Sequence, residues 1–203
     1  VYLRDFERTR APASLQEARG LLDFVVAMEQ GDGEFLNFLR EDGTPNRTAP
    51  SSRKSFGYWG ARGLWALGEA RRVLLASEPA SAERYRAPLD RAVACYAKDI
   101  TAGELSAGSL VAASETLLRL LAYQRAEPTS ARAALAERAA QVLLQRTHTT
   151  PASAPLWGAR VEERGAPTWH AWGARATAAL AQAGLLLQRP ALVSAAQEEA
   201  DTL

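Results

Sequence analysis

The polar stretch 31–54 carries three carboxylates that could cleave a sugar, Asp32, Glu34 and Asp42. Hydrolysis of a glycosidic bond needs two carboxyl groups, one to protonate the leaving oxygen and one to activate water or to attack the sugar. These three acids are therefore the catalytic candidates. The remaining acids in expected loops are also available, and they are Glu41, Glu104, Glu162 and Glu163.

A purely structural role for these acids is equally open. Asp32-Gly33 and Asp42-Gly43 are Asp-Gly pairs, which mark tight turns because glycine accepts a positive φ without a Cβ clash. An aspartate in such a turn commonly accepts hydrogen bonds from its own backbone. The pattern alone does not separate a catalytic carboxylate from a turn residue.

The five tryptophans fall in or just after two long polar stretches, 31–54 and 147–167. Flat rings at the mouth of a pocket are good platforms for sugar faces, although large aromatic side chains also fill cores. Trp65 lies one turn deeper than Trp59 and is expected to be a core residue. The other four are candidates for substrate binding, namely Trp59, Trp157, Trp169 and Trp172.

Several polar side chains complete the candidate binding set, and they are Asn37, Asn46, Arg62, His170 and Arg175. Arg62 and Arg175 each follow a tryptophan by three residues, and both are expected to face inward if their helices are inner helices of the fold. A buried arginine needs a carboxylate or several carbonyls, so structural pairing is the stronger expectation for them. His148, His170 and Cys95 show no metal-ligand spacing, so we expect no metal site, and no cofactor motif is present.

Composition excludes two classes of partner. The 203-residue chain has 24 basic and 23 acidic residues, which give a net charge of +1 and no electrostatic case for nucleic acid or an anionic membrane. No apolar run approaches the ~20 residues that cross a bilayer. With 47% apolar residues the chain can bury a core, and we expect one helical domain over residues 1–203.

Alanine and leucine dominate the chain while isoleucine is nearly absent, which favours helix over strand. A capping box of Ser14 and Glu17 predicts the start of the first long helix. No convincing strand alternation is present, so we expect an all-α chain. Helical spacing predicts segments over residues 14–30, 55–76, 81–98, 109–125, 129–146 and 168–188, and a seventh helix that starts at Pro190.

The predicted helix 55–76 contains glycines at positions 57, 60, 63 and 68. Each interior glycine costs up to about 1 kcal/mol relative to alanine. Glycines kept at that cost predict that another part of the chain approaches this helix very closely.

A repeat relates two of the predicted helices. Residues 59–62 read Trp-Gly-Ala-Arg and recur at 172–175, and the Ala-Leu pair 66–67 recurs at 179–180, both 113 residues later. Half of this offset falls inside the fourth predicted helix. The repeat therefore predicts about three antiparallel hairpins, in which the second, fourth and sixth helices are adjacent and parallel. Chance similarity among alanine-rich helices is the alternative.

The stretch from Gly31 to Gly68 resembles the six-hairpin glycosidase-like proteins. The resemblance rests on Asp-Gly-Glu-Phe-Leu-Asn-Phe at 32–38, Asp-Gly-Thr-Pro-Asn at 42–46, Ser-Ser at 51–52 and the helix that starts at Trp59. Those proteins are (α/α)6 toroids that commonly act on carbohydrate where loops meet the N-termini of inner helices. The resemblance implies that the stretches 31–54 and 147–167 form one sugar-binding pocket in a glycoside hydrolase-like domain.

The same resemblance implies that the chain supplies about half of a toroid, so a homodimer or a longer chain would complete the ring. A secreted or periplasmic location is the matching expectation. The alternative function is a non-catalytic helical repeat scaffold that binds a protein or a second copy of itself.

Overall fold

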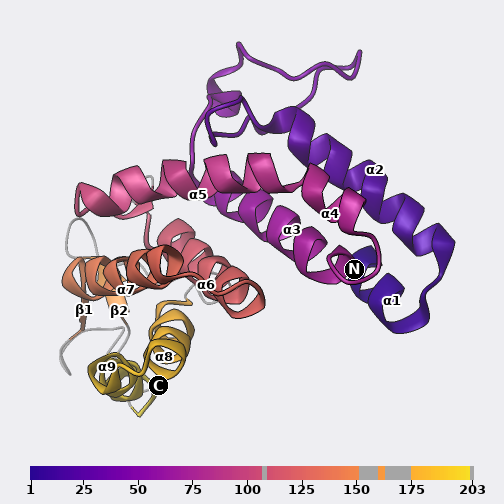
Figure 1. The fold of residues 1–203 in the computed structure, drawn as a ribbon. Helices are drawn as coiled ribbons and strands as arrows, with labels where there is room; N and C mark the ends of the chain where they lie inside the picture. The colour runs from indigo at the N-terminus through magenta and orange to yellow at the C-terminus, as the bar shows by residue number, and fades with distance from the viewer. Residues whose placement is uncertain (107–108, 151–159, 163–174, 202–203) are drawn as a thin grey trace. The chain divides into compact units, whose positions relative to one another are not determined.

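The computed structural model describes residues 1–106, 109–150, 160–162 and 175–201 (Figure 1). These residues are mostly helical, which confirms the all-α expectation. They form two compact units, residues 1–96 and 97–203, and each is treated by itself below. The expectation of a single domain over residues 1–203 stays a prediction.

The first unit is a series of helices joined by one long loop. Its helices are α1 (Tyr2–Thr9), α2 (Pro12–Met28), α3 (Tyr58–Leu74), α4 (Pro79–Arg84) and α5 (Arg86–Thr101), the last of which ends in the second unit, and a 3-10 turn, η1 (Pro50–Ser52), lies in the loop. Its core is formed by fully buried side chains from α3, α5 and the residue that joins α4 to α5: Leu64, Leu67, Leu74, Tyr85, Leu89 and Tyr96.

The predicted capping box at Ser14 is wrong. Helix α2 begins two residues earlier at Pro12, which occupies the first helical position, and no side chain caps it. Proline is favoured there because its fixed φ is helical and its missing N–H would have no helical partner. Ser14 instead donates its hydroxyl hydrogen to the carboxylate of Asp5 in α1, so it links two helices.

The predicted helix over residues 81–98 is divided in two at Tyr85, which separates α4 from α5. Pro88 lies in the first turn of α5. A proline ring clashes with the carbonyl four residues earlier, which here belongs to Arg84, the last residue of α4. The break therefore falls where one unbroken helix would bring these two groups together.

The close approach predicted for the glycine-containing helix is confirmed at two positions. A Cβ on Gly63 would lie 2.6 Å from the ring of Phe35, and one on Gly60 would lie 3.0 Å from the ring of Phe56. Both phenylalanines are buried and both belong to the loop between α2 and α3. The loop is thus packed onto α3 by two rings that only glycine leaves room for.

Consecutive long helices of the first unit run antiparallel. Arg19, in the N-terminal half of α2, pairs with Glu78, which follows the end of α3. At the opposite end, the backbone N–H of Leu36 donates to the carbonyl of Met28 at the end of α2, while Phe35 packs on Gly63 near the start of α3. Helices α2 and α3 therefore form a hairpin around the long loop, as predicted.

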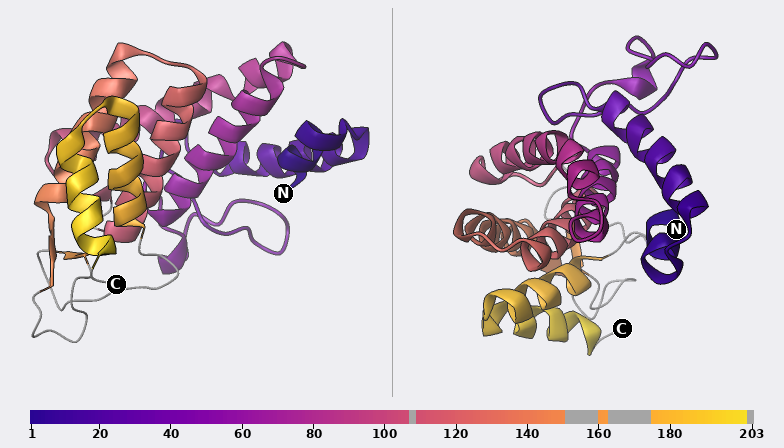
Figure 2. Two further views of the ribbon diagram at one scale, coloured as in Figure 1. Left: turned by 90° about the horizontal axis from the view of Figure 1, so that it is seen from below. Right: turned by 45° about the vertical axis from the view of Figure 1, so that its right-hand side comes forward.

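The second unit contains two further hairpins and a small sheet. Its helices are α6 (Leu110–Ala126), α7 (Ser130–Gln145), α8 (Ala176–Leu187) and α9 (Pro190–Ala200), and its strands are β1 (Thr147–Thr149) and β2 (Arg160–Glu162). Ser109 and Thr129 accept hydrogen bonds from the backbone N–H groups of Ala112 and Arg132 and so cap α6 and α7, at the positions where the sequence predicts these helices to begin. Figure 2 shows α8 and α9 side by side.

The second unit also contains a short strand pair that the sequence did not predict. Strands β1 and β2 pair antiparallel, with His148 opposite Val161. Each strand is only three residues long, which is too short for alternation to be recognised in the sequence. Val161 is fully buried, so the strand pair is anchored in the second unit.

Helices α6 and α8 lie side by side and parallel. At their N-terminal ends, Arg175 pairs with Glu115 at 3.0 Å. At their C-terminal ends, Gln124 of α6 and Leu187 of α8 line the same surface depression. This agrees with the prediction that the fourth and sixth helices are adjacent and parallel. The prediction for the second helix, α3, concerns the other unit and stays a prediction.

Candidate functional site

Two of the three catalytic candidates share one lysine. Lys54 Nζ lies 3.0 Å from a carboxylate oxygen of Glu34 and donates a hydrogen bond to Asp32. The hydrogen bond from Lys54 holds the pKa of Asp32 below its ordinary value, and the same bond raises the pKa of Lys54. Asp32 is therefore held as an anion, whereas a general acid at neutral pH needs a raised pKa.

The third catalytic candidate, Asp42, stabilises a turn. Its Oδ1 accepts hydrogen bonds from the Thr44 hydroxyl at 2.7 Å and the Thr44 backbone N–H at 2.9 Å. The hydrogen bond from the Thr44 hydroxyl is the main cause of a lowered pKa for Asp42. Gly43 has a φ of +79°, as expected for the glycine of an Asp-Gly turn.

The two loop asparagines predicted to bind substrate also serve the loop itself. Asn46 Oδ1 accepts from the backbone N–H groups of Thr48 and Ala49, at 3.1 and 3.0 Å. The side-chain amide of Asn37 donates to the carbonyl of Ser51 at 3.0 Å, and its Oδ1 is closed to solvent. Their observed contacts are those of loop-forming residues.

The base of the loop is fastened by a buried carboxylate that the sequence reasoning did not select. The Glu29 side chain is only 2% exposed and lies 2.6 Å from Nη2 of Arg91 in α5. It also accepts a hydrogen bond from the backbone N–H of Gly33 at 2.7 Å. One signal was present in the sequence, because Glu29 falls four residues after Val25, in line with the apolar positions of α2.

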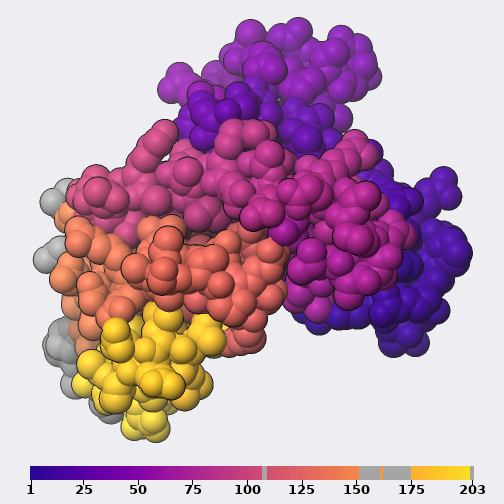
Figure 3. Space-filling view, in the orientation of Figure 1, coloured from indigo at the N-terminus to yellow at the C-terminus, as the bar shows by residue number. Residues whose placement is uncertain are grey.

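The most exposed aromatic side chain next to this loop is Trp59, in the first turn of α3. It is 47% exposed and meets Tyr58 edge to face, with ring centroids 5.5 Å apart. The guanidinium of Arg62 lies 5.1 Å from the centroid of the Tyr58 ring. The N-cap residue of α3 is Gly57, which has no side chain that could cap the helix. In the space-filling view of Figure 3 the loop stands out beyond the end of α2.

Two expectations for α3 are wrong. Arg62 is exposed rather than inward-facing, and Trp65 is 37% exposed rather than a core residue. The helical period explains both outcomes, because the buried face of this part of α3 carries Gly60, Gly63 and Leu64. Residues 62 and 65 then project from a different side of the helix.

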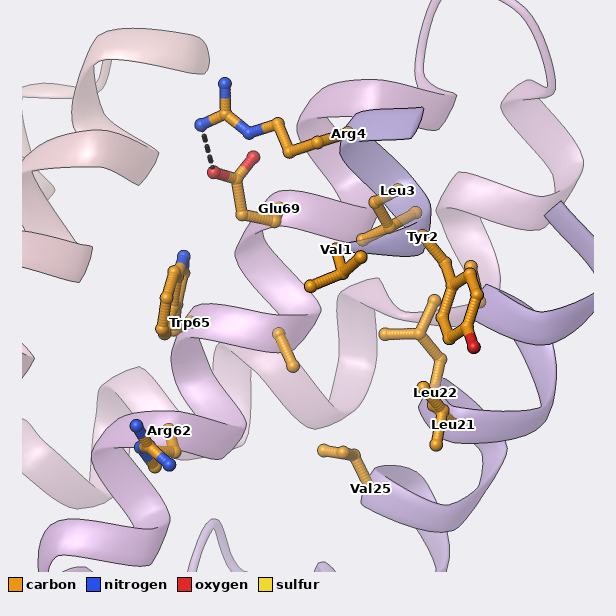
Figure 4. A pocket seen from close by; sticks show the side chains of 12 residues that line it. Val1, Tyr2, Leu3, Arg4, Leu21, Leu22, Val25, Arg62, Trp65 and Glu69 are labelled. Carbon is orange, nitrogen blue, oxygen red and sulfur yellow. Dashed lines mark hydrogen bonds and ion pairs between the residues drawn. The ribbon is translucent and has the colours of Figure 1, made fainter. Parts of the chain in front are cut away.

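Trp65 lines a cavity where α1, α2 and α3 meet (Figure 4). The cavity has a volume of about 380 Å³. Most of its lining is apolar, and Arg62, Arg4 and Glu69 are the charged side chains around it. Its lining residues are Val1, Tyr2, Leu3, Arg4, Ala18, Leu21, Leu22, Val25, Arg62, Trp65, Ala66 and Glu69.

In the second unit, Arg175 is exposed rather than inward-facing, although it has the structural pairing expected for it. Its Nε lies 3.0 Å from one carboxylate oxygen of Glu115, and Arg119 lies 3.0 Å from the other. The other predicted site residues of this unit, Trp157, Trp169, His170 and Trp172, lie outside the described residues. Glu104 pairs with Arg146 at 2.8 Å.

Among the described residues, no group of histidine, cysteine, aspartate or glutamate side chains is placed to hold a metal ion. Nor does this part of the chain contain a helix that is both long and apolar enough to cross a membrane. No model of a protein family matches the chain, and no curated protein matches it.

Proposed function

We propose that this chain is a carbohydrate-binding helical domain of the α/α-toroid type, with the ring of Trp59 as its sugar platform. The observation that carries the proposal is the 47% exposure of Trp59 directly after a polar loop. An exposed indole ring offers a flat apolar face, and the apolar face of a sugar ring can stack on it.

Two neighbouring features support binding at this place. The N-cap residue of α3 is Gly57, which has no side chain to cap the helix, and this favours sugar hydroxyls as partners for the first N–H groups. The loop beside it is held near its first end by Glu29 and Phe35 and near its second end by Phe56. A loop fixed in this way loses little conformational freedom when a ligand binds.

The contacts of the three loop acids favour binding over hydrolysis. Asp32 and Glu34 are joined through Lys54, and Asp42 holds its own turn. Hydrolysis by this set would require a carboxyl group that gives up a proton near neutral pH, and the lowered pKa of Asp32 and of Asp42 opposes that role. The toroid type is supported by the successive antiparallel hairpins and by the parallel pair α6 and α8.

The test is a fluorescence titration of the chain with neutral and acidic oligosaccharides of different backbones. At least one should change tryptophan emission, and Trp59→Ala should weaken its binding by roughly 1–3 kcal/mol, the range of a lost anchor residue. Trp65→Ala is the matched control, since it removes the other half-exposed tryptophan of α3 and should leave sugar binding unchanged.

Two results would contradict the proposal. Absence of any emission change across the whole panel would argue against sugar binding by this unit. Cleavage of an oligosaccharide that disappears in Asp32→Asn, while binding persists, would show that the carboxylates act catalytically despite their pairing with Lys54.

A second candidate function is self-association as a helical scaffold. Leu21 and Phe24 are three residues apart on α2 and are 56% and 41% exposed, and neighbouring exposed apolar side chains often mark a contact surface. A homodimer would bury them. Light scattering over a concentration series should then show a mass that rises to twice that of the chain, and a constant monomer mass would contradict this candidate.

A further inference from the structure

The cavity between α1, α2 and α3 has the character of a small-molecule site separate from the Trp59 platform. Its volume of about 380 Å³ falls within the ~300–1,000 Å³ typical of ligand pockets. Figure 4 shows the Trp65 ring along one wall, with Leu22, Leu21 and Tyr2 on the other side. This is an apolar slot with one flat aromatic wall.

Small side chains at the facing surfaces explain why the slot exists. Ala66 of α3 and Ala18 of α2 both line it, and an alanine leaves space that a leucine would fill. Helix α1 contributes Leu3 to the same lining. The larger side chains Trp65 and Leu21 stand around this space rather than within it, and both are partly exposed.

The charges around the slot are not balanced. Glu69 accepts hydrogen bonds from Arg4 and from Arg72, each at 2.7 Å, so its negative charge is already paired twice. Arg62 lies seven residues earlier on α3, about 10 Å along the helix axis. Among the described residues, the guanidinium of Arg62 contacts the Tyr58 ring and no carboxylate.

An apolar slot beside an arginine that pairs with no carboxylate in the described part of the chain fits a ligand with an apolar body and one anionic group. A guanidinium presents paired N–H donors that match the two oxygens of a carboxylate. The face of an indole ring suits an alkyl chain or an aryl ring equally well. A neutral sugar lacks the anionic group that would pair with Arg62.

We propose that this cavity binds a small apolar carboxylate, with its hydrocarbon part between Trp65, Leu22 and Ala66 and its carboxylate on Arg62. The site differs from the sugar platform in its ligand, its lining and its position on α3. The interaction is reversible binding, and no bond is made or broken.

The test uses decanoate as the probe and decan-1-ol as its neutral counterpart, both below the concentrations at which they aggregate. Binding is followed by the NMR signal of the Trp65 indole N–H, which is assigned from the spectrum of Trp65→Phe. Decanoate should shift this signal saturably and bind more tightly than the alcohol.

Two variants separate the charge from the cavity. Arg62→Gln should weaken decanoate about tenfold, the lower part of the range for a hydrogen bond to a charged group, and leave decan-1-ol unchanged. Arg53→Gln is the matched control, because Arg53 is an exposed loop arginine that does not line the cavity, and it should have no effect. Ala66→Leu should reduce binding of both probes by filling the slot.

The proposal would be overturned by a Trp65 signal that decanoate does not move, or by equal effects of Arg62→Gln and Arg53→Gln. Since Arg62 is exposed, its replacement tests the proposal even if Ala66→Leu fails to fold. Sugar binding is scored separately with Trp59→Ala, which should leave decanoate binding intact. Failure of one site is therefore distinguishable from failure of the other.

Discussion

Gly63 of α3 lies directly against the ring of Phe35, with no room for a side chain between them. A Cβ at this position would stand 2.6 Å from Phe35 Cε1 and 2.7 Å from Cζ. Phe35 is buried, and its backbone exchanges hydrogen bonds with Ser55 at 2.9 and 3.2 Å. A shift of Phe35 away from α3 would therefore disturb the two loop segments that these hydrogen bonds join.

Gly63→Ala should destabilise the chain even though alanine is the better helix former. Overpacking of this kind costs about 1–3 kcal/mol, which exceeds the gain of up to about 1 kcal/mol from helix propensity. Gly68→Ala is the matched control in the same helix, since nothing lies within 4 Å of a Cβ there. Urea unfolding should show opposite signs for the two variants, and two stabilising substitutions would contradict the packing argument.

Glu29→Ala should loosen the loop at its base. The substitution leaves the backbone N–H of Gly33 and the guanidinium of Arg91 without their carboxylate, and a lost hydrogen bond to a charged group costs about 1.5–3 kcal/mol. Limited proteolysis should cut within residues 31–54 faster than in the unmodified chain. Asp90→Ala removes a carboxylate that pairs with Arg86 at 3.7 Å on the exposed side of α5, and it should change stability by no more than about 0.5 kcal/mol. Similar effects of both variants would contradict a special role for Glu29.

Acid should destabilise the first unit through the carboxylates that surround Arg72. A hydrogen bond from Arg72 is the main cause of the lowered pKa of Glu7. Burial acts to raise the pKa of Glu69, but hydrogen bonds from Arg72 and Arg4 outweigh it and leave the pKa below its ordinary value. The folded state therefore binds protons less tightly than the unfolded state does at both groups.

The ionised carboxylates of Glu7 and Glu69 therefore contribute fully to the free energy of unfolding above the ordinary carboxyl pKa of 4.5. This contribution is lost as the pH falls through their lowered pKa values. The melting temperature should therefore stay nearly constant from neutral pH down to about pH 4.5 and should decrease at lower pH. Arg72→Gln should lower the melting temperature at neutral pH and flatten its decline in acid. An unchanged pH profile in this variant would show that other groups control the acid response.

The sequence by itself determined those features that depend on near neighbours along the chain. Ser109 and Thr129 cap the helices that follow them, and Pro190 begins α9, because each acts on backbone groups within one helical turn. The glycines of α3 indicated a close approach, although the sequence did not name the two phenylalanines that make it.

Only the tertiary structure decided which side chains are available for function. The sequence shows that Asp32 and Glu34 are close neighbours along the chain. It does not show that Lys54, 22 residues after Asp32, binds both of them. It placed Trp65 six residues beyond Trp59 on the same helix, but the side of α3 that stays open depends on where α1 and α2 pack. Contacts between distant residues set burial and charge pairing, and a local periodic pattern carries no information about them. For that reason the helices could be predicted from the sequence, while the measured exposure of Trp59 and the cavity beside Trp65 could not.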